Sequence, residues 1–130
     1  MKILAVDYGA KRIGLAIADS ELRVPLPFGI IESHKPEAIS RKFIELIKKE
    51  QIDKVVVGLP LGLDGKENEN TRRVRGFVKE LKKQIGIPIE FIDERFTSAQ
   101  ADRYEGEASR DEKAAMLFLQ SYFEANKQIS

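Results

Sequence analysis

The chain contains no cysteine, which excludes disulfides, thiolate zinc sites and cysteine nucleophiles together. It contains one histidine, His34, which lies in a polar stretch and has no second histidine or cysteine to act as co-ligand. A Ser-His-Asp triad is therefore not a natural interpretation, and we expect His34 to face solvent. What remains as a candidate site is built from carboxylates.

Long apolar runs are also absent. None approaches the roughly 20 residues that a membrane span needs, and Met1-Lys2 leads straight into a strand-length run rather than a signal peptide. We therefore expect a cytosolic (cytoplasmic) protein without membrane contact. The length of 130 residues predicts a single domain, residues 1–130, with one core.

The net charge of +1 conceals an uneven distribution of charged residues. Basic residues gather between Lys66 and Lys83, whereas the segment from Glu90 to Glu112 is rich in acids. A basic flank beside an acidic pocket suits a polyanion held against bound metal. The same charges could equally belong to helix faces that are simply exposed to solvent, and counting charges does not separate the two interpretations.

Three short apolar runs at the N-terminus predict an antiparallel meander. The first two are joined by only four residues, which is typical of a hairpin. Pro25 and Pro27 exclude a central strand until both prolines are passed, so the third strand is expected to begin at Phe28. The three predicted strands cover residues 2–7, 12–18 and 28–32.

The rest of the chain alternates between helical and strand-like periodicity. Ser109 and Glu112 match a capping box, which fixes the start of the last helix. The order predicts an α/β fold with a mixed five-stranded sheet, an antiparallel meander plus parallel strands, flanked by helices. The predicted helices are 36–50, 68–84, 98–104 and 109–125, and the predicted strands are 53–58 and 87–93.

Three acidic residues can meet at one end of this sheet. Asp7 and Glu94 follow predicted strands, where ligands of open α/β sheets bind, and Asp111 opens a helix. Converging carboxylates suit hard divalent cations such as Mg²⁺ or Mn²⁺, which support phosphodiester hydrolysis. Asp93 and Glu112 each neighbour a favoured acid, and spacing alone does not separate them from Glu94 and Asp111.

Each acid also has a structural explanation. Asp111 suits a helix N-terminus through the helix dipole, and Glu94 can form a surface ion pair with Arg95. Asp7 is harder to explain without function, because a charge that ends an apolar strand is costly to bury alone. Thr97 is explained more economically as a helix cap than as a phosphate ligand. The candidate substrate-binding residues are Gly9, Lys11, Arg12, Arg72, Arg73, Arg95 and Thr97.

Four motifs in the same order extend over essentially the whole chain. They are Asp7-Tyr8-Gly9 with Arg12-Ile13-Gly14 and Ala16, Gly58-Leu59-Pro60-Leu61 with Asp64-Gly65, Asp93-Glu94-Arg95-Phe96-Thr97-Ser98, and Asp111 with Ala114-Ala115 and Leu119-Gln120. Together they resemble the signatures of the YqgF/RuvX family. Members are described as Holliday junction resolvases and as nucleases that mature the 5′ end of pre-16S ribosomal RNA.

The resemblance implies an RNase H-like fold in which Asp7, Glu94 and Asp111 are the metal-binding catalytic acids. Phe96 and Ser98 stand where leucine and threonine are usual. Related RNase H-like nucleases carry an acid on the strand that ends here at Gly58, so Glu94 on the following strand would supply the missing ligand.

The sequence therefore favours a metal-dependent nuclease that acts on pre-rRNA or branched DNA, with nucleic acid and ribosomal particles as partners. One alternative is a non-catalytic nucleic-acid-binding or ribosome-associated module of the same fold. A less favoured alternative is an actin-like or sugar-kinase-like ATP-binding domain, which needs two such units where this chain has room for one. The choice between RNA and DNA and the oligomeric state stay open.

Overall fold

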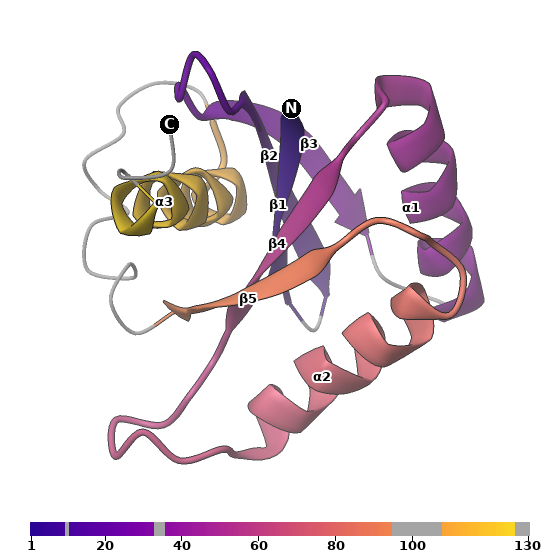
Figure 1. Cartoon of the computed structure of the whole chain (residues 1–130). Helices are drawn as coiled ribbons and strands as arrows, with labels where there is room; N and C mark the ends of the chain where they lie inside the picture. The colour runs from indigo at the N-terminus through magenta and orange to yellow at the C-terminus, as the bar shows by residue number, and fades with distance from the viewer. Residues whose placement is uncertain (10, 33–35, 95–107, 127–130) are drawn as a thin grey trace.

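The structure is a computed structural model, and it describes residues 1–9, 11–32, 36–94 and 108–126. His34, Arg95, Thr97 and the predicted helix 98–104 lie outside the described residues. The elements, in chain order (Figure 1), are β1 (Lys2–Tyr8), β2 (Arg12–Asp19), β3 (Leu26–Glu32), α1 (Pro36–Glu50), β4 (Lys54–Leu59), α2 (Glu69–Lys82), β5 (Ile89–Asp93) and α3 (Arg110–Ala125).

The five strands form one mixed sheet in the order β3-β2-β1-β4-β5. β2 is antiparallel to both β1 and β3, whereas β4 is parallel to β1 and to β5. This arrangement confirms the predicted mixed sheet. Short connections join neighbouring strands in antiparallel directions, whereas helical crossovers allow the next strand to run parallel. The carboxyl ends of β1, β4 and β5 consequently lie at the same edge.

Helices cover both faces of the sheet (Figure 1), with α1 and α2 on one face and α3 on the other. Successive strand residues point to opposite faces. Leu4 and Val6 accordingly join the core beneath α1 and α2, while Ile3 and Ala5 join the core beneath α3. The burial of both faces explains why β1 and β4 are nearly continuous apolar runs.

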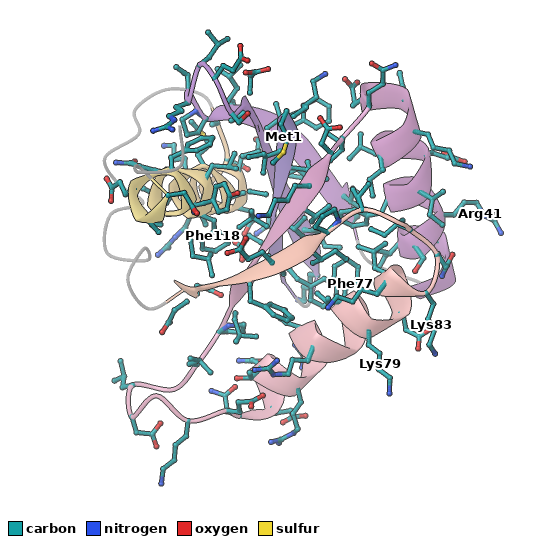
Figure 2. The ribbon with its side chains drawn as sticks, viewed as in Figure 1. Met1, Arg41, Phe77, Lys79, Lys83 and Phe118 are labelled. Carbon is teal, nitrogen blue, oxygen red and sulfur yellow. The ribbon has the colours of Figure 1, made fainter. Side chains whose placement is uncertain are left out.

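Helix α3 packs on the sheet over glycines, and its Phe118 points toward the strands (Figure 2). A Cβ atom added at Gly58 would overlap the ring of Phe118, and one added at Gly14 would overlap the backbone of Asp111. Ala5 and Ala16 add further small side chains to this face. The ring of Phe118 occupies the space that a side chain at position 58 would need. This is a steric reason why β4 carries a glycine there rather than an acid.

The prediction that the third strand begins at Phe28 was wrong, because β3 begins at Leu26 and includes Pro27. β3 is the edge strand, and a proline costs an edge strand no ladder hydrogen bond when its nitrogen faces outward. The register shifts between Leu15 and Ala16, where Gly29 on β3 has a φ of +103°. This bulge turns the Gly29 amide toward α3.

The start of α2 is fixed by a capping box that the sequence analysis did not identify. The Asn68 side chain accepts from the Thr71 amide at 3.1 Å, and the Thr71 hydroxyl accepts from the Asn68 amide at 3.1 Å. The buried Thr71 hydroxyl also contacts the Pro60 carbonyl, which ties the loop after β4 to the helix. Among the described residues, no helix is long and apolar enough to cross a membrane.

Candidate active site

Asp7 lies near the carboxyl end of β1, the central strand of the sheet. The alternation that turns Ile3 and Ala5 toward α3 turns Asp7 toward α3 as well, while Tyr8 packs against the core beneath α1 and α2. Asp7 is partly buried and pairs in register with Gly14 on β2. The carboxylate thus stands between the sheet and the first turn of α3.

The strand alternation also separates Glu94 from Asp93. Ile89 and Phe91 on β5 pack against the core beneath α1 and α2, whereas Ile92 packs on the α3 side. Glu94, immediately after β5, continues the series of Ile92 and is an electrostatic neighbour of Asp7. Asp93 belongs to the other series, so the geometry favours Glu94 as the partner of Asp7.

Asp111 is brought to the same place by glycine. It is the second residue of α3, and its backbone lies directly on Gly14, with the Asp111 Cβ 2.7 Å from where a Gly14 Cβ would stand. Because Gly14 is the register partner of Asp7, this contact sets Asp111 beside Asp7. This role of Gly14 is not predicted from the sequence, although a glycine inside a strand often marks close approach by another backbone.

The electrostatics of Asp7 reflect its burial and the nearness of the other two acids. Burial, followed by the charges of Glu94 and Asp111, raises the pKa of Asp7 from 3.8 to about 7. Burial, followed by the charge of Asp93, raises the pKa of Glu94 as well. Like charges that share a partly buried site oppose each other's ionisation, and a bound cation would offset that repulsion.

Glu112 has a structural role instead. Its Oε1 accepts from the Ser109 amide at 3.1 Å, completing the predicted capping box, and its Oε2 accepts from the Gly29 amide at 2.8 Å. Burial acts to raise the pKa of Glu112, but these backbone hydrogen bonds outweigh it and hold the pKa below its usual value. One carboxylate oxygen of Glu112 thus caps its own helix, and the other joins α3 to the bulge of β3.

The candidate substrate-binding residues divide between the two faces. Arg12 lies beside the acids, with its Nε 3.5 Å from Asp111 Oδ2, and the Gly9 amide closes the hairpin by donating to the Arg12 carbonyl at 3.0 Å. Lys11 is exposed in the same hairpin. Arg72 and Arg73 are exposed on α2, which covers the opposite face from α3.

A divalent metal suits this site by its chemistry. The three candidate donors are all carboxylates, as Mg²⁺ and Mn²⁺ prefer. Burial first, and then the charges of Glu94 and Asp111, raise the pKa of Asp7, and a bound cation would oppose both effects. Within the described part of the chain, however, no group of three acidic or histidine side chains is close enough to surround one ion. The three acids therefore suit a divalent metal by donor type and by charge, although their described positions do not form a closed set of ligands.

Comparison with protein families gives one match over nearly the full chain. The family model described as RuvX, Holliday junction resolvase, matches residues 1–125. A protein of Maridesulfovibrio salexigens described as "Putative pre-16S rRNA nuclease" is 34% identical over 131 residues, covering 94% of this chain and 97% of that protein. A Phocaeicola vulgatus protein with the same description is 37% identical over 141 residues, covering 98% and 99%.

Solved structures share the fold at low sequence identity. RuvC of T. thermophilus in complex with a Holliday junction substrate superposes with a TM-score of 0.68 at 12% identity, covering 96% of this chain and 95% of that one. The Fowlpox virus resolvase in complex with Holliday junction DNA gives a TM-score of 0.62 at 16% identity, covering 96% and 98%. These similarities confirm the predicted RNase H-like fold.

Proposed function

Because the chain belongs to the RuvX family of nucleases and Holliday junction resolvases, we propose that it is a metal-dependent nuclease with Asp7, Glu94 and Asp111 as its catalytic acids. Its proposed substrates are the 5′ end of pre-16S rRNA, branched DNA, or both. The observation that carries the proposal is the placement of Glu94 and Asp111 around the partly buried Asp7, which raises the pKa of Asp7 to about 7.

In the proposed mechanism the three acids would hold Mg²⁺ or Mn²⁺, and Arg12 would bind the phosphate of the substrate beside them. When bound, such a metal lowers the pKa of water to near neutrality and offsets the charge on the leaving oxygen. Asp7 supplies the central carboxylate because it has both other acids as electrostatic neighbours. The sheet and α3 hold Asp7 and Asp111 in fixed positions, so little reorganisation is needed when substrate binds.

Arg12 is the proposed phosphate ligand. Its guanidinium reaches the site through an exposed ion pair with Asp111, and such pairs contribute only about 0–1 kcal/mol to stability. Arg12→Ala is therefore expected to leave the melting temperature nearly unchanged while raising KM for the nucleic acid roughly tenfold, because one charge-assisted phosphate contact is lost. Steady-state cleavage kinetics beside thermal melting will measure both. An unchanged KM would remove Arg12 from the substrate site.

A pair of neighbouring acids tests the proposed site. Glu94→Gln is expected to lower cleavage by at least about a hundredfold, because it removes a charge that faces Asp7. Asp93→Asn is the matched control, because it removes a charge one residue earlier on β5. Asp93 raises the pKa of Glu94, so its removal favours the ionised form of Glu94, and cleavage by this variant should not fall below that of the wild type. Both variants keep the size and polarity of the side chain, so folding should be preserved.

The assay compares pre-16S rRNA fragments, linear single strands and four-way DNA junctions, each with Mg²⁺, Mn²⁺ or a chelator. The proposal expects metal-dependent cleavage of at least one structured substrate by the wild type. Equal activity of the Glu94→Gln and Asp93→Asn variants, or cleavage that persists in chelator, contradicts the assignment of the site. The preferred substrate in this assay decides between ribosomal precursor and branched DNA.

A further inference from the structure

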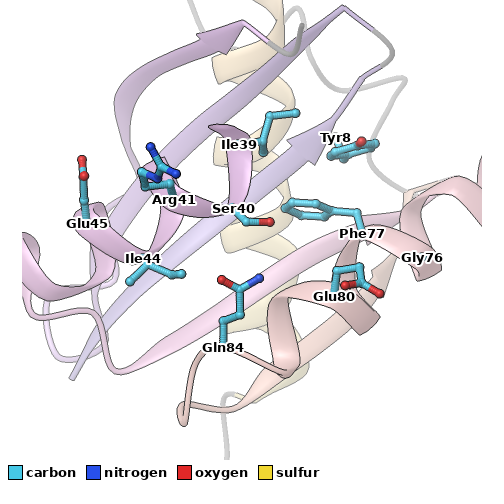
Figure 3. Close-up of a pocket in the computed structure, with 10 residues that line it drawn as sticks. All are labelled: Tyr8, Ile39, Ser40, Arg41, Ile44, Glu45, Gly76, Phe77, Glu80 and Gln84. Atoms are coloured by element: carbon cyan, nitrogen blue, oxygen red, sulfur yellow. The ribbon is translucent and has the colours of Figure 1, made fainter. Parts of the chain in front are cut away.

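A groove of about 720 Å³ lies between α1 and α2, on the face of the sheet opposite the acids (Figure 3). Its size falls within the range of small-molecule sites, which is about 300–1,000 Å³. Tyr8 and Phe77 form an aromatic wall, with ring centroids 4.4 Å apart. Ser40, Gln84 and Glu80 add polar groups to the groove. The groove thus combines a flat apolar surface with hydrogen-bonding side chains.

Gly76 indicates that this space is used. It lies inside α2, although glycine is a poorer helix former than any other residue except proline. No atom of the described chain lies within 4 Å of a Cβ added there, and the φ of Gly76 is not positive. The fold therefore gives no reason for glycine at this position. A partner that approaches the helix backbone closely would give one.

The charges favour a nucleic-acid strand as that partner. α1 and α2 together carry nine basic and five acidic residues, and Arg72 and Arg73 lie one helical turn before Gly76 and Phe77. The groove lining itself contains Arg41 but also Glu45 and Glu80, so it suits a neutral base better than a phosphate. These features suit a single nucleic-acid strand. Its phosphates would lie along the basic helices, and one base would enter the groove and contact the aromatic side chains.

The position of Tyr8 connects the groove to the acids. Tyr8 immediately follows Asp7 on β1 and points to the opposite face of the sheet. A nucleic-acid strand bound at the acids therefore needs only to pass around the end of β1 to reach the groove. We propose that the groove between α1 and α2 binds a single-stranded segment of the nucleic-acid substrate, with an unpaired base against Tyr8 and Phe77. This assignment rests on the proposed nuclease function and adds a second contact region to it.

The test fills the groove and measures binding without cleavage. Gly76→Phe places a ring into the groove, and Gly86→Phe is the matched control, because a Cβ at Gly86 also meets no atom of the described chain within 4 Å and Gly86 does not line the groove. Gly76→Ala adds only a Cβ at the same place and so tests close approach of the ligand to the helix backbone. Fluorescence anisotropy in chelator compares a labelled single-stranded oligouridylate with an abasic oligomer of the same length, and thermal melting confirms folding.

Gly76→Phe should weaken binding of the oligouridylate on the order of tenfold, the loss expected when one base–aromatic stack is removed. Gly86→Phe should leave the affinity unchanged, whereas Gly76→Ala should weaken binding, though less than Gly76→Phe does, because its Cβ obstructs close approach to the helix backbone. The effect of Gly76→Phe should disappear on the abasic oligomer. Equal weakening on both oligomers, or no weakening on either, overturns the proposal. Conversion of a wild-type dimer to a monomer by Gly76→Phe in sedimentation, without loss of oligouridylate affinity, also overturns it and assigns the groove to a second copy of the chain.

The result is separable from the nuclease proposal. If the wild type cleaves with metal but Gly76→Phe binds the oligouridylate normally, the groove assignment fails and the nuclease proposal stands. If binding follows the expected pattern but no substrate is cleaved with Mg²⁺ or Mn²⁺, the groove assignment stands and the nuclease proposal fails.

Discussion

Asp7→Asn is expected to abolish cleavage and, at the same time, to stabilise the metal-free protein above pH about 7. Cleavage should fall by at least about a hundredfold, because the central carboxylate of the proposed metal site is lost. Stability should rise because Asp7, when ionised, is a partly buried charge that faces Glu94 and Asp111. The substitution removes that repulsion while keeping the shape of the side chain.

The pH dependence of this effect follows from the raised pKa. Between pH 3.8 and about 7 the folded protein holds a proton on Asp7 that the unfolded chain releases, so the free energy of unfolding falls as the pH rises. Above about 7 the full cost is present, on the order of 2–4 kcal/mol. Below 3.8 Asp7 is protonated in both states, and the wild type and the Asn variant should be equally stable.

Urea unfolding in chelator over this pH range measures the difference between wild type and variant. Titration with Mg²⁺ should then raise the melting temperature of the wild type more than that of the variant, because a ligand stabilises only the state that binds it. A variant less stable than the wild type above pH about 7 would contradict the proposed electrostatics. Unchanged cleavage by a folded Asp7→Asn protein would remove Asp7 from the catalytic site. Nucleic-acid binding without cleavage by either protein would favour the non-catalytic module instead.

Gly14→Ala is expected to have the second large effect. The added Cβ would overlap the backbone of Asp111, and backbone atoms in a helix cannot move aside as a flexible side chain can. Such overpacking typically costs about 1–3 kcal/mol. The helix start should shift away from β2 and carry Asp111 away from Asp7, so cleavage should fall by about tenfold or more even where the protein remains folded.

Gly86→Ala is the control for this experiment, because the space around Gly86 is open within the described structure. Urea unfolding and cleavage rates are measured for both variants at a temperature where each is folded. Loss of cleavage by Gly14→Ala alone supports the role of Gly14 in placing Asp111. If Gly14→Ala retains both the stability and the activity of the Gly86→Ala protein, then close contact between α3 and β2 is unnecessary for the site.

Most of the fold could be predicted because its signals are local. The apolar run of β1, the helical periodicity of α1 and the capping box of Ser109 and Glu112 each depend on residues within a few positions of one another. The start of β3 was missed because tolerance of Pro27 depends on whether a strand is at the edge of the sheet. The position of a strand in the sheet depends on its pairing with strands that are distant in the sequence.

For the proposed site, the sequence by itself determined which acids were candidates. It also determined that each of them follows a strand or begins a helix. The choice between them had to come from tertiary structure or from a family resemblance, because neighbours such as Asp93 and Glu94 differ only in the face toward which they point. Only the fold decided that Gly14 holds Asp111 beside Asp7, and that Glu112 is engaged by the Gly29 amide. The physical reason is that convergence depends on how closely a helix can approach a sheet, which is set by atoms far apart in the chain.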